Sequence, residues 1–278
     1  MSKTWFVTGA GRGIGAAIVK AALAAGDRVV ATGRDPAKVA RAFEASPDRL
    51  LVATLDVAVH GQAEAAVEAA IERFGGVDVL VNNAGYGLLG AFEQSEPAQA
   101  ERQFATNVFG VFAVTRAVLP VMRKQRAGRI FNVTSIGGLR GGPGGSLYSA
   151  SKFAVEGFSE SLALEIAEFG ISVTLVEPGF FRTDFLDASS IRYGDKQIAD
   201  YDALSQRLRE FYDARSHRQA GDPAKLAKIL VDLAAHEKPP LRFVAGADAV
   251  AMFETKIASV SAELAAWRSL SVTTDGDF

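Results

Sequence analysis

The sequence predicts an α/β fold, a doubly wound parallel sheet of about seven strands, in a single domain that spans residues 1–278. Two observations predict it. Short apolar runs alternate with segments of helical periodicity from Trp5 to Val176, with no linker and no shift of composition between them. The apolar runs are also continuous rather than alternating, which is typical of parallel strands buried on both faces.

The first part of the chain is expected to contain four strands and three helices. Asp35-Pro36 is typical of a helix N-cap followed by proline at the first helical position, so it begins the second helix. The strands are expected at Trp5–Thr8, Arg28–Thr32, Leu50–Leu55 and Val77–Val81, and the helices at Gly13–Ala25, from Asp35 to about Ala45, and at His60–Phe74.

The rest of the chain continues this alternation with one interruption. Residues 184–221 are richer in charge and tyrosine and follow neither a helical nor a strand period. Around this segment, helices are expected from about Glu96 to Gln125, at Ser146–Phe169 and at Asp222–His236, and strands at Ile130–Thr134, Ile171–Val176 and Arg242–Ala245.

A last helix, at residues 249–270, extends beyond this pattern. Its large apolar residues are spaced 4, 3, 4 and 3 apart, which makes an amphipathic stripe. We expect the stripe to be buried against this subunit or against a neighbouring one, and residues 273–278 to be frayed. The stripe consists of Phe253, Ile257, Val260, Leu264 and Trp267.

The composition excludes several classes of function. Because the chain has no cysteine, it has no disulfide framework, thiolate nucleophile or thiolate metal ligand, and its three scattered histidines do not predict a metal site. A net charge of −2 argues against nucleic acid as a partner. No apolar run approaches the roughly 20 residues that span a bilayer, and no signal peptide precedes the first strand. We therefore expect a cytoplasmic protein without a membrane partner.

A glycine-rich turn lies between the first strand and the first helix. It reads Thr8-Gly9-Ala10-Gly11-Arg12-Gly13-Ile14-Gly15. At this place in a doubly wound sheet, backbone N–H groups and the helix N-terminus can receive a pyrophosphate. Any tight turn needs glycine, but the position after the first strand favours binding of a dinucleotide.

The end of the second strand indicates which dinucleotide. An acidic residue there binds the ribose hydroxyls of NAD, whereas a cation favours the 2′-phosphate of NADP. The strand ends in Gly33-Arg34, and both Arg34 and Arg12 can bind that phosphate. Asp35 is the rival candidate, but a helix cap explains it better. NADP(H) is therefore favoured over NAD(H).

The segment from Ser135 to Lys152 carries the predicted chemistry. Tyr148 and Lys152 share one face of a helix because they are four residues apart. A phenol titrates near pH 10, and an ammonium beside it favours the phenolate and lowers that pKa. Such a tyrosine can exchange a proton with a carbonyl or alcohol oxygen that the Ser135 hydroxyl holds. This pair also occurs by chance on many solvated helix faces.

Asn107 is unusual because it lies on the apolar stripe of its helix. A buried amide costs a few kcal/mol unless it is hydrogen-bonded, so it is expected to have partners. A satisfied core asparagine that bends the helix and a functional asparagine are equally compatible with this position.

Several of these features occur in a shared order. They are Thr8-Gly9-x-x-x-Gly13-Ile14-Gly15, Asn82-Asn83-Ala84-Gly85, Asn107, Ser135, Tyr148-x-x-x-Lys152 and Pro178-Gly179. In order and spacing they resemble the short-chain dehydrogenase/reductase family, in its compact single-domain branch, over about residues 3–246. The resemblance implies a Rossmann-type fold and an oxidoreductase that uses a nicotinamide cofactor.

The resemblance also implies roles for single residues. Tyr148 is the general acid or base, Lys152 lowers its pKa and binds the nicotinamide ribose, and Ser135 holds the substrate oxygen. Asn107 lies at a kink and helps to retain a water that links Lys152 to solvent. Asp56 lies near the adenine, although an ordinary turn aspartate explains it about as well. The implied cofactor-binding residues are Gly9, Arg12, Gly13, Ile14, Gly15, Arg34, Asp56, Val57, Asn83, Ala84, Gly85, Tyr148, Lys152, Pro178, Gly179 and Thr183.

The expected reaction interconverts a ketone or aldehyde with an alcohol by hydride transfer. Two alternatives use the same residues: a nucleotide-binding redox sensor without turnover, and an isomerase or dehydratase that returns the hydride to its product. Segment 184–221 is expected to form a lid over the substrate. Its aromatic residues, with Leu88, Phe180, Phe181 and Phe185, favour an apolar substrate, unless they serve only packing.

Two further expectations concern partners. Arg140, in the glycine loop, can meet an acidic group of the substrate, although a solvent-exposed arginine explains it better. Members of the family usually associate through the helices that here hold Asn107 and Lys152. The resemblance therefore implies a homodimer or a homotetramer.

Overall fold

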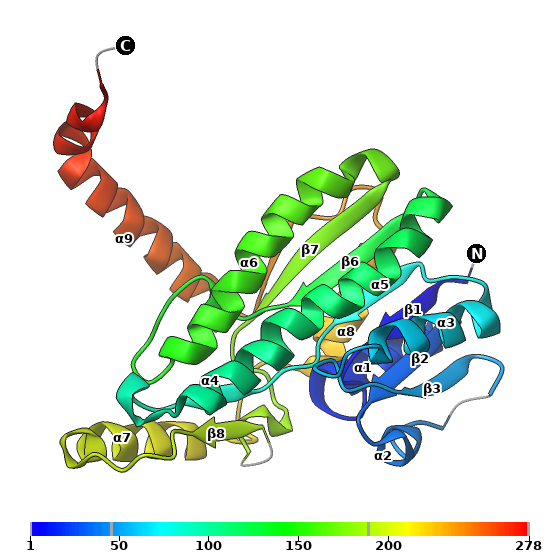
Figure 1. The fold of residues 1–278 in the computed structure, drawn as a ribbon, viewed down its shortest axis with the longest axis horizontal. Helices are drawn as coiled ribbons and strands as arrows, with labels where there is room; N and C mark the ends of the chain where they lie inside the picture. The colour runs from blue at the N-terminus through cyan, green and yellow to red at the C-terminus, as the bar shows by residue number, and fades with distance from the viewer. Residues whose placement is uncertain (1, 45–46, 188–189, 277–278) are drawn as a thin grey trace.

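A seven-stranded parallel sheet forms the centre of the computed structural model, which describes residues 2–44, 47–187 and 190–276 (Figure 1). The spatial order of the strands is β3-β2-β1-β4-β6-β7-β9. The strands are β1 (Thr4–Val7), β2 (Arg28–Gly33), β3 (Leu50–Thr54), β4 (Val79–Asn82), β6 (Gly128–Val133), β7 (Ile171–Pro178) and β9 (Arg242–Ala245). The predicted doubly wound, Rossmann-type sheet is confirmed.

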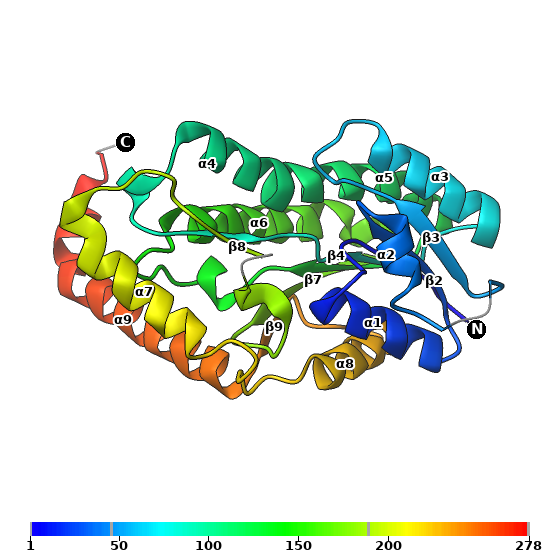
Figure 2. The same ribbon diagram turned by 90° about the horizontal axis from the view of Figure 1, so that it is seen from below.

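Helices cover both faces of this sheet (Figure 2). Helices α1 (Gly13–Ala24) and α8 (Pro223–Ala235) cover one face, and α3 (Gln62–Phe74), α5 (Gly110–Gln125) and α6 (Ser146–Ile166) cover the other. Neighbouring residues of one strand therefore enter different cores: Trp5 stacks on Phe131 beneath α1 and α8, whereas Phe6 belongs to the core beneath α3 and α5. This two-sided burial explains why the strands read as continuous apolar runs.

The order of the strands reverses beside β1. From β1 the chain continues outward through β2 and β3, and then returns to pair β4 with the other edge of β1. At such a switch point the loops that leave two neighbouring strands separate, and ligands of open α/β sheets bind in the crevice at the carboxyl ends of the strands.

Two predicted helices differ from their expected limits. The pattern predicted from Glu96 to Gln125 is split into α4 (Pro97–Phe104), a π-helical turn (Ala105–Phe109) and α5. Helix α2 (Pro36–Ala40) is shorter than predicted, and the expected end at Ala45 lies outside the described residues. Asp35 caps α2 as expected, because its Oδ1 accepts a hydrogen bond of 3.0 Å from the N–H of Lys38.

The segment from Pro97 to Gln125 corrects the expectation that no apolar segment approaches the length that spans a bilayer. It is long and apolar enough to cross a membrane by length and composition, with a mean hydropathy of 1.5 in its most apolar window. Its apolar residues Val114, Val118 and Met122 are completely buried against the sheet and α3. We therefore interpret it as a core helix of the fold.

The segment after residue 184 contains regular structure that the sequence pattern does not reveal. Strand β8 (Ile191–Tyr193) pairs in parallel with β5 (Gly87–Leu89), and α7 (Asp202–Asp213) follows. Three-residue strands are too short to show a period, which is why these two were missed. Together they build a wall beside the carboxyl ends of the main sheet (Figure 1).

Helix α9 (Ala247–Ser271) projects from the rest of the molecule (Figure 1). Its first turns contact β9 and the short helical turn Ile136–Gly138. Beyond them the predicted apolar stripe is exposed, since 52% of Ile257 and 63% of Trp267 are accessible to solvent. The stripe is therefore not buried against its own subunit.

Candidate active site

A cavity of about 1640 Å³ lies along the carboxyl ends of the sheet. It extends from Arg34 at one end to Phe211 of α7 at the other. Of the predicted site residues, Gly15 and Asn107 do not line the cavity. Those that line it are Gly9, Arg12, Gly13, Ile14, Arg34, Asp56, Val57, Asn83, Ala84, Gly85, Ser135, Tyr148, Lys152, Pro178, Gly179 and Thr183.

The glycine turn is tied to the loop after β4. Nδ2 of Asn83 donates to the carbonyl oxygens of Thr8 (2.9 Å) and Gly9 (3.2 Å), while Oγ1 of Thr8 accepts from the N–H groups of Asn83 and Ala84. Gly15 lies against this junction, because a Cβ there would stand 2.5 Å from both Nδ2 of Asn83 and the carbonyl oxygen of Gly9. Gly15 thus supports the turn from behind.

Three cations gather at the far end of the cavity. Arg34, Lys38 and Arg12 line it, and Asp35 lines it beside them. Oδ1 of Asp35 is occupied by its cap of α2. Lys38 was missed by the sequence analysis, although its position in the first turn after Asp35-Pro36 places it on the side of the cavity.

Asp56 and Val57 line the same end of the cavity. Oδ1 of Asp56 accepts from the N–H of Ala58 (3.0 Å), and its own N–H donates to Oε1 of Gln62 (2.7 Å). Asp56 therefore lines the cavity, as expected, and its side chain also stabilises the local turn, as the alternative interpretation expected.

The chain after β7 closes the cavity from the opposite side. Oδ2 of Asp248, in the first turn of α9, accepts a hydrogen bond of 2.8 Å from the N–H of Phe180, which holds the loop after Gly179. Thr183 lies beside Gly13, because a Cβ at Gly13 would stand 3.4 Å from Cβ of Thr183, an ordinary contact distance. The glycine turn and the segment after Gly179 therefore adjoin where both line the cavity.

Tyr148 and Ser135 meet beside the short helical turn Ile136–Gly138. A Cβ at Gly137 would stand 3.2 Å from the Tyr148 ring and 3.4 Å from Oγ of Ser135, so Gly137 lies in close contact with both side chains. Oγ of Ser135 accepts a hydrogen bond of 3.0 Å from the N–H of Gly137. Burial raises the pKa of Tyr148 to about 12, and its hydrogen bond with Ser135 offsets part of that rise.

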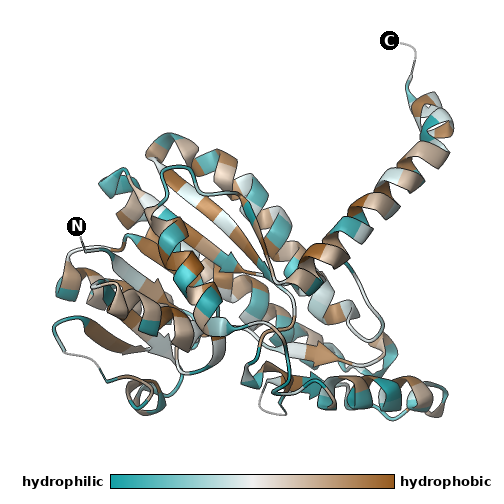
Figure 3. Ribbon diagram, turned by 180° about the vertical axis from the view of Figure 1, so that it is seen from behind, coloured by the Kyte–Doolittle hydropathy of each residue, from teal (hydrophilic) through white to brown (hydrophobic). Residues whose placement is uncertain are grey.

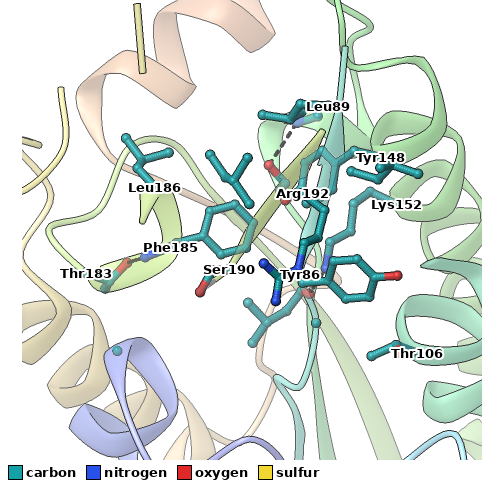
Figure 4. Close-up of a pocket in the computed structure, with 18 of the residues that line it drawn as sticks. Tyr86, Leu89, Thr106, Tyr148, Lys152, Thr183, Phe185, Leu186, Ser190 and Arg192 are labelled. Carbon is teal, nitrogen blue, oxygen red and sulfur yellow. Dashed lines mark hydrogen bonds between the residues drawn. The ribbon is translucent and has the colours of Figure 1, made fainter. Parts of the chain in front are cut away.

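Lys152 lies one helical turn after Tyr148, and Figure 4 shows the two side chains entering the site from the same helix. Nζ of Lys152 donates to the carbonyl oxygen of Val133 (2.9 Å) and lies 5.9 Å from the centre of the Tyr148 ring. Burial lowers the pKa of Lys152 to about 8. The expected lowering of the Tyr148 pKa by this ammonium is not met, because desolvation of the phenol raises the pKa and the Ser135 hydroxyl, rather than Lys152, offsets part of the rise.

Asn107 lies in the π-helical turn, with its amide fully bonded. Oδ1 accepts from the N–H of Tyr86 (3.1 Å), and Nδ2 donates to the carbonyl oxygen of Tyr86 (3.0 Å) and to Oγ of Ser151 (3.1 Å). A Cβ at Gly85 would stand 3.1 Å from Oδ1 of Asn107 and 3.7 Å from Nζ of Lys152, so both polar groups face the same residue. Asn107 joins the loop after β4 to α6.

A buried charge cluster lies behind Lys152. Nη1 of Arg242 donates to Glu156 of α6 and to Glu177 of β7 at 2.6 Å each, and Nη2 bonds Glu160. Glu177 is completely buried. Burial raises the pKa of Glu177 to about 7, and the neighbouring Glu156 adds to the rise. The negative charge of Glu156, one turn beyond Lys152, partly offsets the lowering of the Lys152 pKa.

Apolar side chains surround the other end of the cavity. Leu89, Leu186 and Ile191 form a buried cluster against which Tyr148, Phe180, Phe185 and Tyr212 pack. The Phe185 ring lies 6.0 Å from the Tyr148 ring, and Figure 4 shows it extending into the cavity. Arg140 also lines the cavity and is exposed.

Tyr86, Arg192 and Met252 are among the lining residues that the sequence analysis did not single out. Tyr86 directly follows Asn83-Ala84-Gly85, and that position was the available signal. Figure 4 shows Arg192 of β8 beside Tyr86, and the positive charges of Arg102 and Arg192 partly offset the rise that burial causes in the pKa of Tyr86. Met252 of α9 lines the cavity from the far end of the chain, where no local pattern marks it.

One group of potential metal ligands lies at the edge of the lid segment. Ligand atoms of Asp184, Asp187 and His217 lie within 4.8 Å of one another. Nε2 of His217 pairs with Oδ1 of Asp187 at 3.0 Å, and the same oxygen accepts from Ser216. The sequence separation of His217 from the two aspartates concealed this arrangement. The pairing of His217 with Asp187 explains why these side chains lie together.

Comparison with known proteins identifies the family of this site. The model of the short chain dehydrogenase family matches residues 3–193. The chain belongs to this family. The short-chain dehydrogenase is 39% identical over 275 residues to Oxidoreductase BOA17 of Botryotinia fuckeliana, which covers 98% of this chain and 99% of the relative. It is 40% identical over 241 residues to a 3-ketodihydrosphingosine reductase of Bacteroides thetaiotaomicron, which covers 86% of each chain.

Solved structures agree with this assignment. A short-chain dehydrogenase of Streptomyces avermitilis superposes with a TM-score of 0.91 at 39% identity, covering 99% of this chain and 100% of the other. A relative from Burkholderia phymatum was solved with NAD; its identity is 27% and its TM-score 0.77, covering 87% of this chain and 88% of the other. A gluconate 5-dehydrogenase of Burkholderia cenocepacia was solved with NADP and tartrate; its identity is 27% and its TM-score 0.69, covering 87% of this chain and 92% of the other.

The residues of this short-chain dehydrogenase fit a nicotinamide dinucleotide. The glycine turn stands at the N-terminus of α1, where Gly9 and Gly13 have φ of 65° and 57° and leave backbone rather than side chains facing the cavity. The cavity runs without interruption from this turn to Tyr148. The chain is an oxidoreductase of its family, with a nicotinamide cofactor.

Proposed function

We propose that the protein interconverts a ketone or aldehyde and the corresponding alcohol, with NADP(H) as cofactor. One observation carries the proposal: Tyr148, Ser135 and Lys152 converge at the carboxyl ends of the sheet, where the cofactor cavity meets the apolar end. This is the arrangement that a proton donor, an oxygen-holding hydroxyl and a nearby cation need.

In this proposal Tyr148 donates a proton to the carbonyl oxygen of the substrate, and Ser135 donates a hydrogen bond to the same oxygen. When bound, the nicotinamide supplies the hydride for reduction or accepts it in the reverse direction. Because the pKa of Tyr148 is about 12, the phenol is protonated at neutral pH and ready to act as an acid. Alcohol oxidation runs the same proton transfer backwards and is favoured as pH rises.

Lys152 acts on the phenolate that remains after proton transfer. Its ammonium lies on the same helix face, and an opposite charge at this range stabilises the phenolate. Asn107 holds the loop after β4 and Ser151 in register with Lys152 through its three hydrogen bonds. We assign Asn107 a positioning role.

The preference for NADP(H) is supported by the basic end of the cavity. Arg34, Arg12 and Lys38 line it, and the carboxylate of Asp35 is turned to its helix cap. A guanidinium binds a phosphate through paired, charge-assisted hydrogen bonds. Gly9, Asn83 and Thr183 would hold the rest of the cofactor.

An apolar substrate is supported by the aromatic wall. Phe180, Phe185 and Tyr212 gather around Tyr148 from segment 184–221 and the loop before it. Burial of apolar substrate surface here excludes water from Tyr148, which strengthens its interactions with the developing charge. We propose that 184–221 acts as the lid. The cytoplasmic location and the homo-oligomeric state stay predictions.

Oxidation of NADPH and of NADH against a panel of ketones and aldehydes of graded hydrophobicity tests the proposal. We expect turnover with apolar carbonyl compounds, and higher kcat/KM with NADPH. Binding of NADPH without turnover on any member of the panel favours the redox sensor. Conversion of a substrate without net oxidation of NADPH favours the isomerase or dehydratase.

A further inference from the structure

Helix α9 exposes an apolar face that its own subunit does not cover. Every residue from Ile257 to Gly276 is exposed to solvent, including Leu264 (58%) and Trp267 (63%). Figure 3 shows this helix extending from the body with hydrophobic segments along its length. An isolated helix in water is marginally stable without tertiary packing, and contiguous exposed apolar surface marks an interaction site.

The spacing on this face is that of a coiled coil. Val250, Ile257 and Leu264 repeat every seven residues, and Phe253, Val260 and Trp267 repeat in the same way three residues later. These are the a and d positions of three heptads, which form a seam on one side of a helix and pack against a second helix.

We propose that α9 pairs with α9 of a second copy of this chain, in an antiparallel two-stranded coiled coil. In the register that covers the fully exposed part of the seam, from Ile257 to Trp267, Ile257 faces Trp267 of the second copy and Leu264 faces its Val260. Symmetry repeats both layers, so the four central seam residues of each helix are covered. This proposal is independent of the reaction proposed for the cavity.

The charges beside the seam support pairing with a second copy of this chain. In an antiparallel pair, g positions face g positions. The register above then places Lys256 against Glu263 of the second copy, and symmetry repeats this attractive contact. A parallel pair would oppose Glu263 to Arg268 and Lys256 to Ser261, so exchanging the charges of residues 256 and 263 distinguishes the two orientations.

The length of α9 agrees with the same register. The last helical turn, at Val272–Thr274, comes level with Val250 of the second copy, where α9 leaves the body of the molecule. The exposed part of each helix is then covered along its whole length. The base of the helix stays with its own subunit, where Asp248 bonds Phe180 and Met252 lines the cavity.

Charge reversal with rescue tests the interface in the full-length protein. Glu263→Lys places a lysine against Lys256 of the second copy, twice in each pair, and is expected to weaken association by about tenfold or more. Lys256→Glu combined with Glu263→Lys restores opposite charges in the antiparallel register only. The mass in solution, measured by light scattering over a concentration series, reports association, and circular dichroism confirms folding.

The expected result is a lower mass for Glu263→Lys at concentrations where wild type and the double variant associate fully. Equal masses for wild type and Glu263→Lys overturn the proposal. Loss of association in both variants overturns the antiparallel register.

Disulfide trapping gives a second, independent readout, because the natural chain has no cysteine. Ile257→Cys and Trp267→Cys chains are mixed and oxidised. We expect a covalent dimer in the mixture and none from either variant alone, since the two copies of residue 257 lie about ten residues apart along the pair. Cross-linking of Ile257→Cys with itself indicates a parallel pair. No cross-link in any sample, with unchanged mass, indicates a different occupant of the face and overturns the proposal.

Discussion

The two ends of the cavity are formed by different groups, backbone at the cofactor end and side chains at the substrate end. At the cofactor end, backbone groups of the glycine turn are bonded to the loop after β4 through Thr8 and Asn83. At the substrate end, side chains from β5, β8 and α7 pack on one another, and Phe185 packs on Tyr148 of α6.

This difference has a functional consequence. Backbone geometry at strand ends is set by the sheet, so one cofactor end can serve many enzymes. A wall of side chains on short elements can change without disturbing the sheet, so the substrate can differ between relatives. The following predictions test the division, from the largest expected effect to the smallest.

Tyr148 joins the two ends, and its loss has the largest effect. Tyr148→Phe removes the proposed proton donor and is expected to lower kcat by about 10³-fold or more. Affinity for NADPH, measured by fluorescence titration, is expected to stay unchanged. Tyr212→Phe is the matched control, because it removes a hydroxyl from the same aromatic cluster and is expected to keep most of the activity. Turnover of Tyr148→Phe within tenfold of wild type contradicts the role.

Arg34 tests the basic character of the cofactor end. Arg34→Asp replaces the cation proposed to bind the 2′-phosphate with an acid, so the ratio of kcat/KM for NADPH over NADH is expected to fall by about 10–100-fold. Arg41→Asp makes the same charge change at the end of α2, on an exposed side chain outside the cavity lining, and serves as control. An unchanged preference for NADPH in Arg34→Asp contradicts the assignment.

Glu177, in the charge cluster behind Lys152, tests how burial in the sheet affects the stability of the fold. Its pKa rises to about 7 in the folded protein from a usual value near 4.5. A raised carboxyl pKa stabilises the fold below the unfolded pKa, and this contribution is lost as pH rises through the folded pKa. The free energy of unfolding is therefore expected to fall by roughly 1–2 kcal/mol between pH 5 and pH 8.

Denaturant unfolding at several pH values measures this change. Glu177→Gln keeps a neutral side chain at all pH values, so the fall is expected to disappear. Glu165→Gln, on an exposed position of α6, is the control and is expected to keep it. An identical pH profile in wild type and Glu177→Gln contradicts the prediction.

Gly144 tests the substrate end, which is formed by side chains on short elements. It has a φ of 69°, and a Cβ there would stand 2.2 Å from Cδ1 of Leu208 on α7. Gly144→Ala is therefore expected to displace the Leu208 side chain and strain the loop, and to raise the KM for the carbonyl substrate about threefold to tenfold, with the KM for NADPH unchanged. Gly141→Ala is the control, because a Cβ at Gly141 meets nothing within 4 Å. A change in the KM for NADPH alone would show that the two ends are not separable.

Much of the fold was predictable from local pattern. The strands of the main sheet are apolar on both faces, and the capping signal at Asp35-Pro36 depends only on neighbouring residues. The short strands β5 and β8 were not predictable, because three residues show no period and their pairing joins segments about a hundred residues apart.

The sequence by itself determined the cofactor turn, the proposed proton donor with its partners, and the apolar stripe of α9, since each depends on residue types at fixed spacing. Tertiary structure alone decided how they interact. Desolvation raised the pKa of Tyr148 against the expected effect of Lys152, and Glu177 met Glu156 at Arg242 from three distant elements. Burial and long-range proximity set these energies, and neither is a property of a local pattern. The same reason left the stripe of α9 exposed, because its own subunit offers no surface along that face.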